Sequence, residues 1–175
     1  LIRSHVQTVV VVLLLSACNL HRSPSPSALP PEADLAGTRQ ALQPLVESLE
    51  VRVNRDRDVL GLPALVPSQA LNEAAGLRAE DMTARGYLGP IGPGDISVAP
   101  QDLMSAAGYS GQLGELIYEH DGPLSSLTES AVGAWMASDA HRRLLLDTRL
   151  RYIGVGLRGE ADRWVVVMLF AEVGP

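Results

Sequence analysis

The pattern of apolar and polar positions predicts two amphipathic helices in the first half of the chain. The first begins near Leu42 and ends near Gly61 and Pro63, and the second runs from Ser68, whose hydroxyl can cap it, to Gly86. The apolar faces consist of Leu42, Leu45, Val46, Leu49 and Val53 in the first helix and of Leu71, Ala75, Ala79 and Met82 in the second. Each face needs a covering surface, so we expect both helices to pack on a common core.

The next part of the chain mixes loop, strand and helix patterns. Gly and Pro crowd residues 89–100, which predicts a loop, and a short helix is expected over residues 101–107. Residues 113–120 have the character of a β-strand. Ser126 and Glu129 form a capping box, which predicts the start of a third long helix.

Two strands close the chain. Residues 152–158 and 164–173 flank a turn containing Gly159 and Asp162, which predicts an antiparallel hairpin. The stretch Val165–Phe170 is apolar throughout, so its strand is expected to be central and covered on both faces. Helices that precede a terminal hairpin favour an α+β fold, and the simplest packing is a three-layer α-β-α sandwich around a small antiparallel sheet.

Residues 1–17 have the pattern of a signal peptide. Arg3 and His5 precede the apolar run Val9–Leu15, which is far shorter than the ~20 residues that a membrane-spanning helix needs. Small residues then lead to Cys18, and the segment resembles the lipobox of bacterial lipoproteins, in which the cysteine is lipidated. The alternatives are an ordinary secreted protein, or a buried apolar helix with a chance cysteine. The lipobox predicts a cell-envelope protein, exported and held at the membrane by its lipid.

Composition divides the rest of the chain into a tether and one domain. Residues 18–40 contain the candidate lipidated cysteine and a stretch rich in Pro and Ser, which is typical of an extended tether. Residues 41–175 suffice for one domain, and the single cysteine excludes an internal disulfide. A net charge of -6 without a dense basic run argues against nucleic acid as a partner.

Several short motifs, taken in order, resemble the CAP superfamily of cysteine-rich secretory proteins, insect venom allergens and plant pathogenesis-related proteins, and in particular its compact bacterial branch. The matching positions are Asn54, Arg57, Gly61, Leu62 and Leu65; Leu71, Ala74, Ala75 and Met82; Ala107, Gly108, Tyr109 and Glu115; Trp135, Ser138, His141 and Arg142; and Gly154 to Gly156. The order of these motifs is more specific than any one of them.

The resemblance implies an extracytoplasmic domain with a groove between helices and sheet, where His and Glu side chains gather. It assigns Glu115, Ser138, His141 and Arg142 to a ligand-binding cleft. Family members have been linked to lipid binding, metal binding and host or envelope interaction, with no shared enzymatic reaction. The chain departs from the family pattern at three positions, Pro90 in place of a histidine and Leu116 and Leu144 in place of asparagines.

Glu115 and His141 are the candidate metal ligands. A zinc site needs at least three converging ligands, and the sequence supplies these two. Glu119 shares a strand face with Glu115, whereas His120 points to the other face. The structural alternative is that His141 hydrogen-bonds at a helix terminus while Glu115 pairs with Arg142 or a backbone amide.

The sequence therefore favours a non-catalytic binding module for a lipid, an amphipathic molecule or a peptide of the envelope, tethered to the membrane through Cys18. One alternative is a metal-dependent hydrolase that uses the Glu115 and His141 cleft with zinc as its cofactor. Another is a purely structural envelope protein. Serine hydrolysis by Ser138 and His141 is disfavoured, because no nucleophile elbow and no orienting acid are identifiable.

Overall fold

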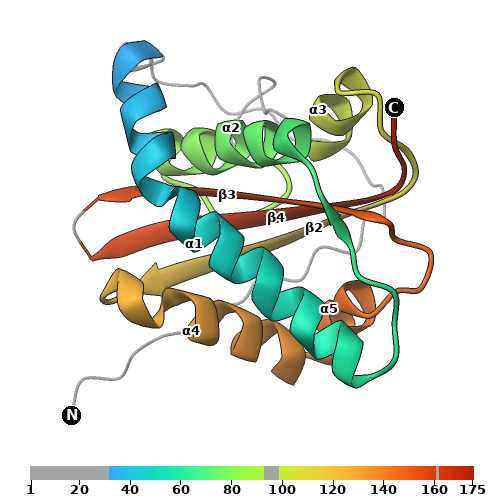
Figure 1. Ribbon diagram of the computed structural model, residues 1–175. Coiled ribbons are helices and arrows are strands. Elements are labelled where there is room, and N and C mark those ends of the chain that lie inside the picture. Colours follow the sequence, from blue (N-terminus) through green and yellow to red (C-terminus); the bar gives the residue numbers. More distant parts are fainter. Residues whose placement is uncertain (1–31, 93–98, 161) are drawn as a thin grey trace.

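A four-stranded sheet lies at the centre of the molecule, and helices cover both of its faces (Figure 1). The computed structural model describes residues 32–92, 99–160 and 162–175. In chain order its elements are α1 (Glu32–Val59), β1 (Val66–Pro67), α2 (Gln69–Arg85), α3 (Pro100–Ala106), β2 (Ser110–Asp121), α4 (Leu124–Ala137), α5 (Asp139–Leu145), β3 (Tyr152–Glu160) and β4 (Arg163–Val173). The predicted signal peptide, Cys18 and the tether up to residue 31 lie outside the described residues.

The sheet has the strand order β1-β3-β4-β2, and β4 pairs antiparallel with both β3 and β2. The predicted terminal hairpin is confirmed, although β3 extends to Glu160 and β4 already begins at Arg163. The sequence did not predict β1, a two-residue strand that pairs in parallel with β3, with Val66 opposite Tyr152. The sheet is therefore mixed and not wholly antiparallel, within the α-β-α sandwich that was predicted.

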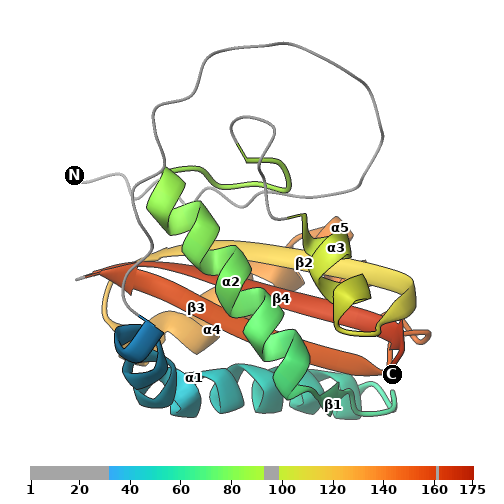
Figure 2. The same cartoon turned by 90° about the horizontal axis from the view of Figure 1, so that it is seen from above.

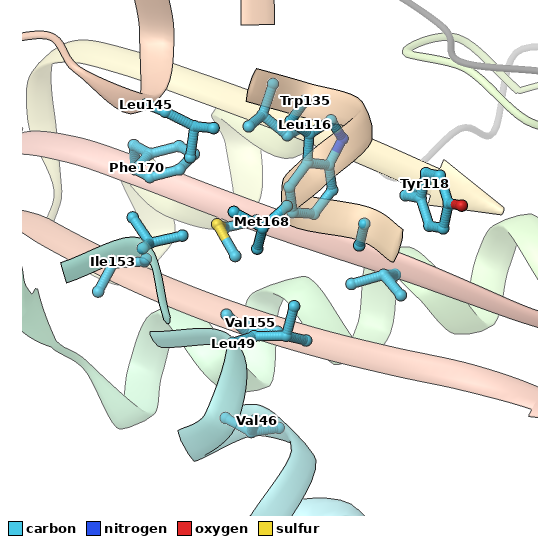
Figure 3. Packing of buried hydrophobic residues seen from close by; sticks show 14 of the residues in the cluster. Val46, Leu49, Leu116, Tyr118, Trp135, Leu145, Ile153, Val155, Met168 and Phe170 are labelled. Carbon is cyan, nitrogen blue, oxygen red and sulfur yellow. The ribbon is translucent and has the colours of Figure 1, made fainter. Parts of the chain in front are cut away.

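Side chains of β4 alternate between two hydrophobic cores, one on each face of the sheet. The two sets are Val166, Met168 and Phe170, which face α1, α4 and α5, and Val165, Val167, Leu169 and Ala171, which face α2 and α3. The predicted apolar stretch Val165–Phe170 is buried throughout. Figure 3 shows the first core, where Trp135 of α4 and Leu116 of β2 lie near the β4 side chains. Figure 2 shows α2 and α3 on the other face.

The ends of α2 follow the predicted local chemistry. Ser68 is the N-cap, and its side chain accepts a hydrogen bond from the Leu71 amide at 3.3 Å. Gly86 ends the helix with a left-handed backbone (φ 65°), and its amide donates to the Met82 carbonyl. The sequence therefore predicts α2 almost to the residue.

Two glycines of β3 allow α2 to lie directly against the sheet. A Cβ atom on Gly154 would lie 2.2 Å from the Cβ of Leu71, and one on Gly156 would lie 2.1 Å from the amide nitrogen of Gly76. The side chain of Asn72 adds a polar link, because its Oδ1 accepts a hydrogen bond from the Val155 amide at 2.6 Å. The Gly-Val-Gly motif is thus a packing motif.

Helix α1 is longer than the sequence predicted. It begins at Glu32, so residues 32–40 of the predicted tether are helical. This segment carries no apolar repeat, and periodicity starts only at Leu42, which explains the late prediction.

The boundaries of α4 and α5 also differ from expectation. Pro123 is the N-cap of α4, so Ser126 and Glu129 do not form the predicted capping box. The hydroxyl of Ser126 donates instead to the Pro123 carbonyl at 3.0 Å. Ser138 ends α4 in an extended conformation and α5, which was not predicted, begins at the next residue.

Candidate functional site

Glu115, the predicted groove carboxylate, lies on β2 and faces α2. Its register partner on β4 is Leu169, which belongs to the core beneath α2. Oε1 of Glu115 accepts a hydrogen bond from Nε of Arg78 at 2.9 Å. The side chain of Arg78 is 0% exposed and that of Glu115 is 4% exposed. Glu115 therefore forms a buried ion pair, with Arg78 as its partner and not Arg142.

The guanidinium of Arg78 uses all three of its nitrogens. NH1 donates to the phenol oxygen of Tyr87 at 2.5 Å and lies 3.8 Å from Oδ2 of Asp81, while NH2 donates to the Gly89 carbonyl. Tyr87 in turn donates to Asp81. We call these five residues, Arg78, Asp81, Tyr87, Gly89 and Glu115, the Arg78 network. It ties α2, β2 and the segment after α2 together.

Burial changes the proton affinities within the Arg78 network. Loss of solvent raises the pKa of Glu115 above its usual value, and the charge and hydrogen bond of Arg78 oppose this rise. Burial, followed by the hydrogen bond to Asp81, raises the pKa of Tyr87 to about 12, so the phenol keeps its proton at neutral pH. Oε2 of Glu115 is buried and has no hydrogen-bond partner among the described residues. Arg78 is therefore the main stabiliser of the Glu115 charge.

Arg78 was not among the predicted site residues, although the sequence contains a signal for it. Arg78 lies on the same buried face of α2 as Leu71, Ala75 and Met82. An arginine is rarely buried unless an acidic or polar partner compensates its charge, so its position in this apolar face indicates a buried counter-ion. Glu115 is 37 residues away, and only the tertiary structure identifies it as that counter-ion.

Ser138, His141 and Arg142 belong to the junction between α4 and α5. The Ser138 amide donates to the Trp135 carbonyl at 3.2 Å, and the Ser138 carbonyl accepts from the Arg142 amide at 2.8 Å. The Arg142 guanidinium donates to the Met136 carbonyl at 2.9 Å. These bonds stabilise the turn between the two helices.

Helix α5 and the Glu115 side chain lie on opposite faces of the sheet. His141 is 2% exposed and belongs to α5. Leu145 of α5 is part of the core beneath α1 and α4, and Leu144 lies against Gly114, where an added Cβ would come within 2.5 Å of Leu144 Cδ1. Successive strand residues point to opposite faces, so Glu115 points toward α2. A cleft shared by Glu115 and His141 stays a prediction.

Two further titratable residues of β2 bind nearby groups. Glu119 accepts a hydrogen bond from Nε of Arg163 at 2.5 Å. Nε2 of His120 lies 3.1 Å from the Pro123 carbonyl and 3.4 Å from the Ser126 hydroxyl, at the turn into α4. Across the parts of the chain that the structure describes, no group of three or more His, Cys, Asp or Glu side chains could hold a metal ion.

The three departures from the family pattern occupy different environments. Leu116 is buried in the core beneath α1 and α4, on the face opposite Glu115 (Figure 3). Leu144 packs against that core, next to Gly114. Pro90 is partly buried and follows the carbonyl that binds Arg78. Leu116 therefore contributes to the core and does not line a cleft with Glu115.

The opening motif of the domain binds backbone groups. The side-chain amide of Asn54 donates to the Leu65 carbonyl at 2.9 Å and accepts from the Leu65 amide at 2.7 Å. Arg57 is fully buried and donates to the carbonyls of Pro63, Leu145 and Asp147. Both residues thus stabilise connections between elements.

A shallow apolar depression lies where α1 meets α4 and the end of α5. Its lining residues are Val53, Asp56, Val132, Met136, Leu145 and Leu146, and it is too shallow to enclose a water molecule. Met136 and Leu146 are partly exposed, so apolar surface is accessible at this point. We call this feature the α1–α4 depression.

Comparison with known proteins identifies the family. Residues 51–170 match the family model described as CAP, the cysteine-rich secretory protein family. The chain is 29% identical over 143 residues to the protein YkwD of Bacillus subtilis (strain 168), and the match covers 79% of this chain and 53% of YkwD. The chain thus spans about half the length of this relative. The α-β-α sandwich with these motifs belongs to the CAP class of domains, and this chain belongs to the CAP family.

Solved structures share the fold. An extracellular protein of Bacillus anthracis str. Ames that contains an SCP domain aligns with a TM-score of 0.62 at 20% identity, over 84% of this chain and 45% of that one. An outer surface protein of Borrelia burgdorferi aligns with a TM-score of 0.60 at 19% identity, over 71% of this chain and 89% of that one. These similar proteins lie outside the cell or on its outer surface.

In residues 32–92, 99–160 and 162–175, no helix combines the length and the apolar character needed to cross a bilayer.

Proposed function

We propose that this CAP-family chain is an extracytoplasmic, lipid-anchored binding module that catalyses no reaction of its own. The observation that carries the proposal is the buried ion pair between Glu115 and Arg78. A general base or metal ligand needs an oxygen that can reach a substrate proton or a metal ion. Oε1 of Glu115 is bound to a buried arginine, so the groove carboxylate has an internal structural partner.

The α1–α4 depression supports an apolar ligand. Its walls are apolar apart from Asp56, and it lies beside α5, which carries the matched His141. The depression encloses no space for even a water molecule, whereas typical small-molecule pockets hold roughly 300–1,000 Å³. It can therefore act only as a surface contact, against which part of an acyl chain or one side chain of a bound peptide would lie.

Ligand titration tests this proposal. We expect the chain carrying Cys18→Ser to bind a fluorescent fatty acid, a lysolipid or a member of an envelope peptide pool with saturation. Met136→Lys, which places a charge in the depression, should weaken that binding by about tenfold or more. Val51→Lys is the matched control, because Val51 is 66% exposed elsewhere on α1. Absence of saturable binding would favour a purely structural envelope protein, and equal binding by the Met136→Lys variant would exclude the α1–α4 depression as the binding site.

The lipid anchor is tested separately. We expect Cys18→Ser to move the protein from the membrane fraction to the soluble fraction of the expressing bacterium, because the several acyl chains of a bacterial lipoprotein hold a protein firmly. Fractionation followed by immunoblotting measures the change, and Ser16→Thr serves as a neighbouring control that retains Cys18. Continued membrane association of the Cys18→Ser protein would contradict lipidation at this residue.

A further inference from the structure

We infer that Arg78 is the resident cation of Glu115 and that it excludes divalent metal ions from this carboxylate. The inference goes beyond the proposed function, because it concerns what the network binds and not which ligand the domain carries. The family resemblance made Glu115 a candidate metal ligand, together with His141. The residues around Glu115 do not fit that role.

The guanidinium lies where a cation would have to bind. It faces four oxygens, Oε1 of Glu115 at 2.9 Å, the phenol oxygen of Tyr87 at 2.5 Å, Oδ2 of Asp81 at 3.8 Å and the carbonyl of Gly89. Two carboxylates, a phenol and a carbonyl are hard oxygen donors, which suit a cation. Arg78 already supplies the positive charge, and each of its three nitrogens has a partner.

Displacing Arg78 would be costly. Its side chain is 0% exposed, and a guanidinium keeps its charge even when buried. A metal ion on Glu115 would leave this charge buried with one acidic partner fewer, and breaking a buried ion pair is strongly destabilising. Asp81 is also bound to Arg85, at 3.2 Å, which reduces its availability as a metal ligand.

Zinc would also lack ligands at this place. A zinc site takes at least three side-chain ligands of imidazole, thiolate or carboxylate type. The structure, in the residues it describes, contains no group of three such side chains. Arg78 is therefore the residue that decides which cation the carboxylate binds.

Metal titration of the full chain carrying Cys18→Ser tests the inference. We expect titration calorimetry with zinc chloride and with calcium chloride to detect no binding event that depends on Glu115, so the Glu115→Gln variant should give the same isotherms. Addition of either metal should shift the thermal midpoint of the Cys18→Ser chain no more than it shifts the thermal midpoint of the Glu115→Gln variant. Uptake of one equivalent of either metal that disappears in Glu115→Gln would overturn the inference.

A second set of variants tests the pairing itself. Arg78→Met should lower the thermal midpoint by on the order of 10 °C, because it leaves a buried carboxylate without its cation. The double variant Arg78→Met with Glu115→Leu should recover part of that loss, because no buried charge remains. If Arg78→Met does not fold, a folded double variant still demonstrates the coupling. A double variant as unstable as the sum of its two single variants would contradict the pairing.

Discussion

Replacing Arg57 with methionine is expected to lower the free energy of unfolding by about 3–5 kcal/mol. Nε of Arg57 donates to the Pro63 carbonyl at 3.0 Å, and NH1 donates to the carbonyls of Leu145 at 2.8 Å and Asp147 at 3.1 Å. Methionine fills similar space but donates nothing, so three carbonyls lose a charged donor. The residue joins the end of α1 to the loop after α5, and both connections should loosen together.

Urea unfolding, followed by circular dichroism, measures the effect of Arg57→Met. The matched control is Arg55→Met, because Arg55 is an exposed arginine two residues earlier on the same helix. Exposed substitutions of this kind usually change stability by about 0.5 kcal/mol or less. Equal unfolding midpoints for the two variants would refute the structural role given to Arg57.

The substitution Gly156→Ala is expected to destabilise the domain by about 3 kcal/mol. The added Cβ would lie 2.1 Å from the amide nitrogen of Gly76 and 2.2 Å from the carbonyl carbon of Ala75. Both atoms belong to the backbone of α2, so a side-chain rotation cannot relieve the overlap. Either α2 or β3 must move, and the core beneath α2 would open.

Gly133→Ala is the internal control for this prediction. Gly133 is exposed on α4, and an added Cβ there meets nothing within 4 Å. Alanine should stabilise this helix by about 0.5–1 kcal/mol, because glycine loses more backbone freedom on folding. Thermal unfolding of both variants should thus show shifts of opposite sign. A Gly156→Ala protein as stable as the parent would contradict the close packing of α2 on β3.

Local chemistry explains which parts of the fold the sequence predicted. Helix α2 has a capping serine at one end and a glycine at the other, and the β3–β4 hairpin joins two apolar stretches by a short turn, so neighbouring residues determine both. Strand β1 has two residues and no pattern of its own, and its pairing with β3 depends on how the chain returns from α1. The start of α4 at Leu124 instead of Ser126 likewise reflects the turn from β2, where His120 and Ser126 contact the Pro123 carbonyl.

The sequence likewise predicted only some residues of the candidate site. Sequence motifs singled out Glu115, and the structure places it in a buried ion pair. Its partner Arg78 comes from a distant helix, and no local spacing connects the two residues. Side chains that the motifs also marked, Asn54 and Arg57, bind backbone groups. A shared cleft of Glu115 and His141, the lipid on Cys18 and the ligand stay predictions. Cys18 lies outside the described residues, and the cleft would have to join side chains from α5 and from the opposite face of the sheet.

A crystal structure of the domain grown in the presence of zinc chloride shows whether Arg78 or a metal ion binds the Glu115 carboxylate. We expect Nε of Arg78 within hydrogen-bond distance of Oε1 of Glu115, with no metal density on the carboxylate. Zinc bound by Glu115 and His141, with Arg78 turned away, would contradict this expectation.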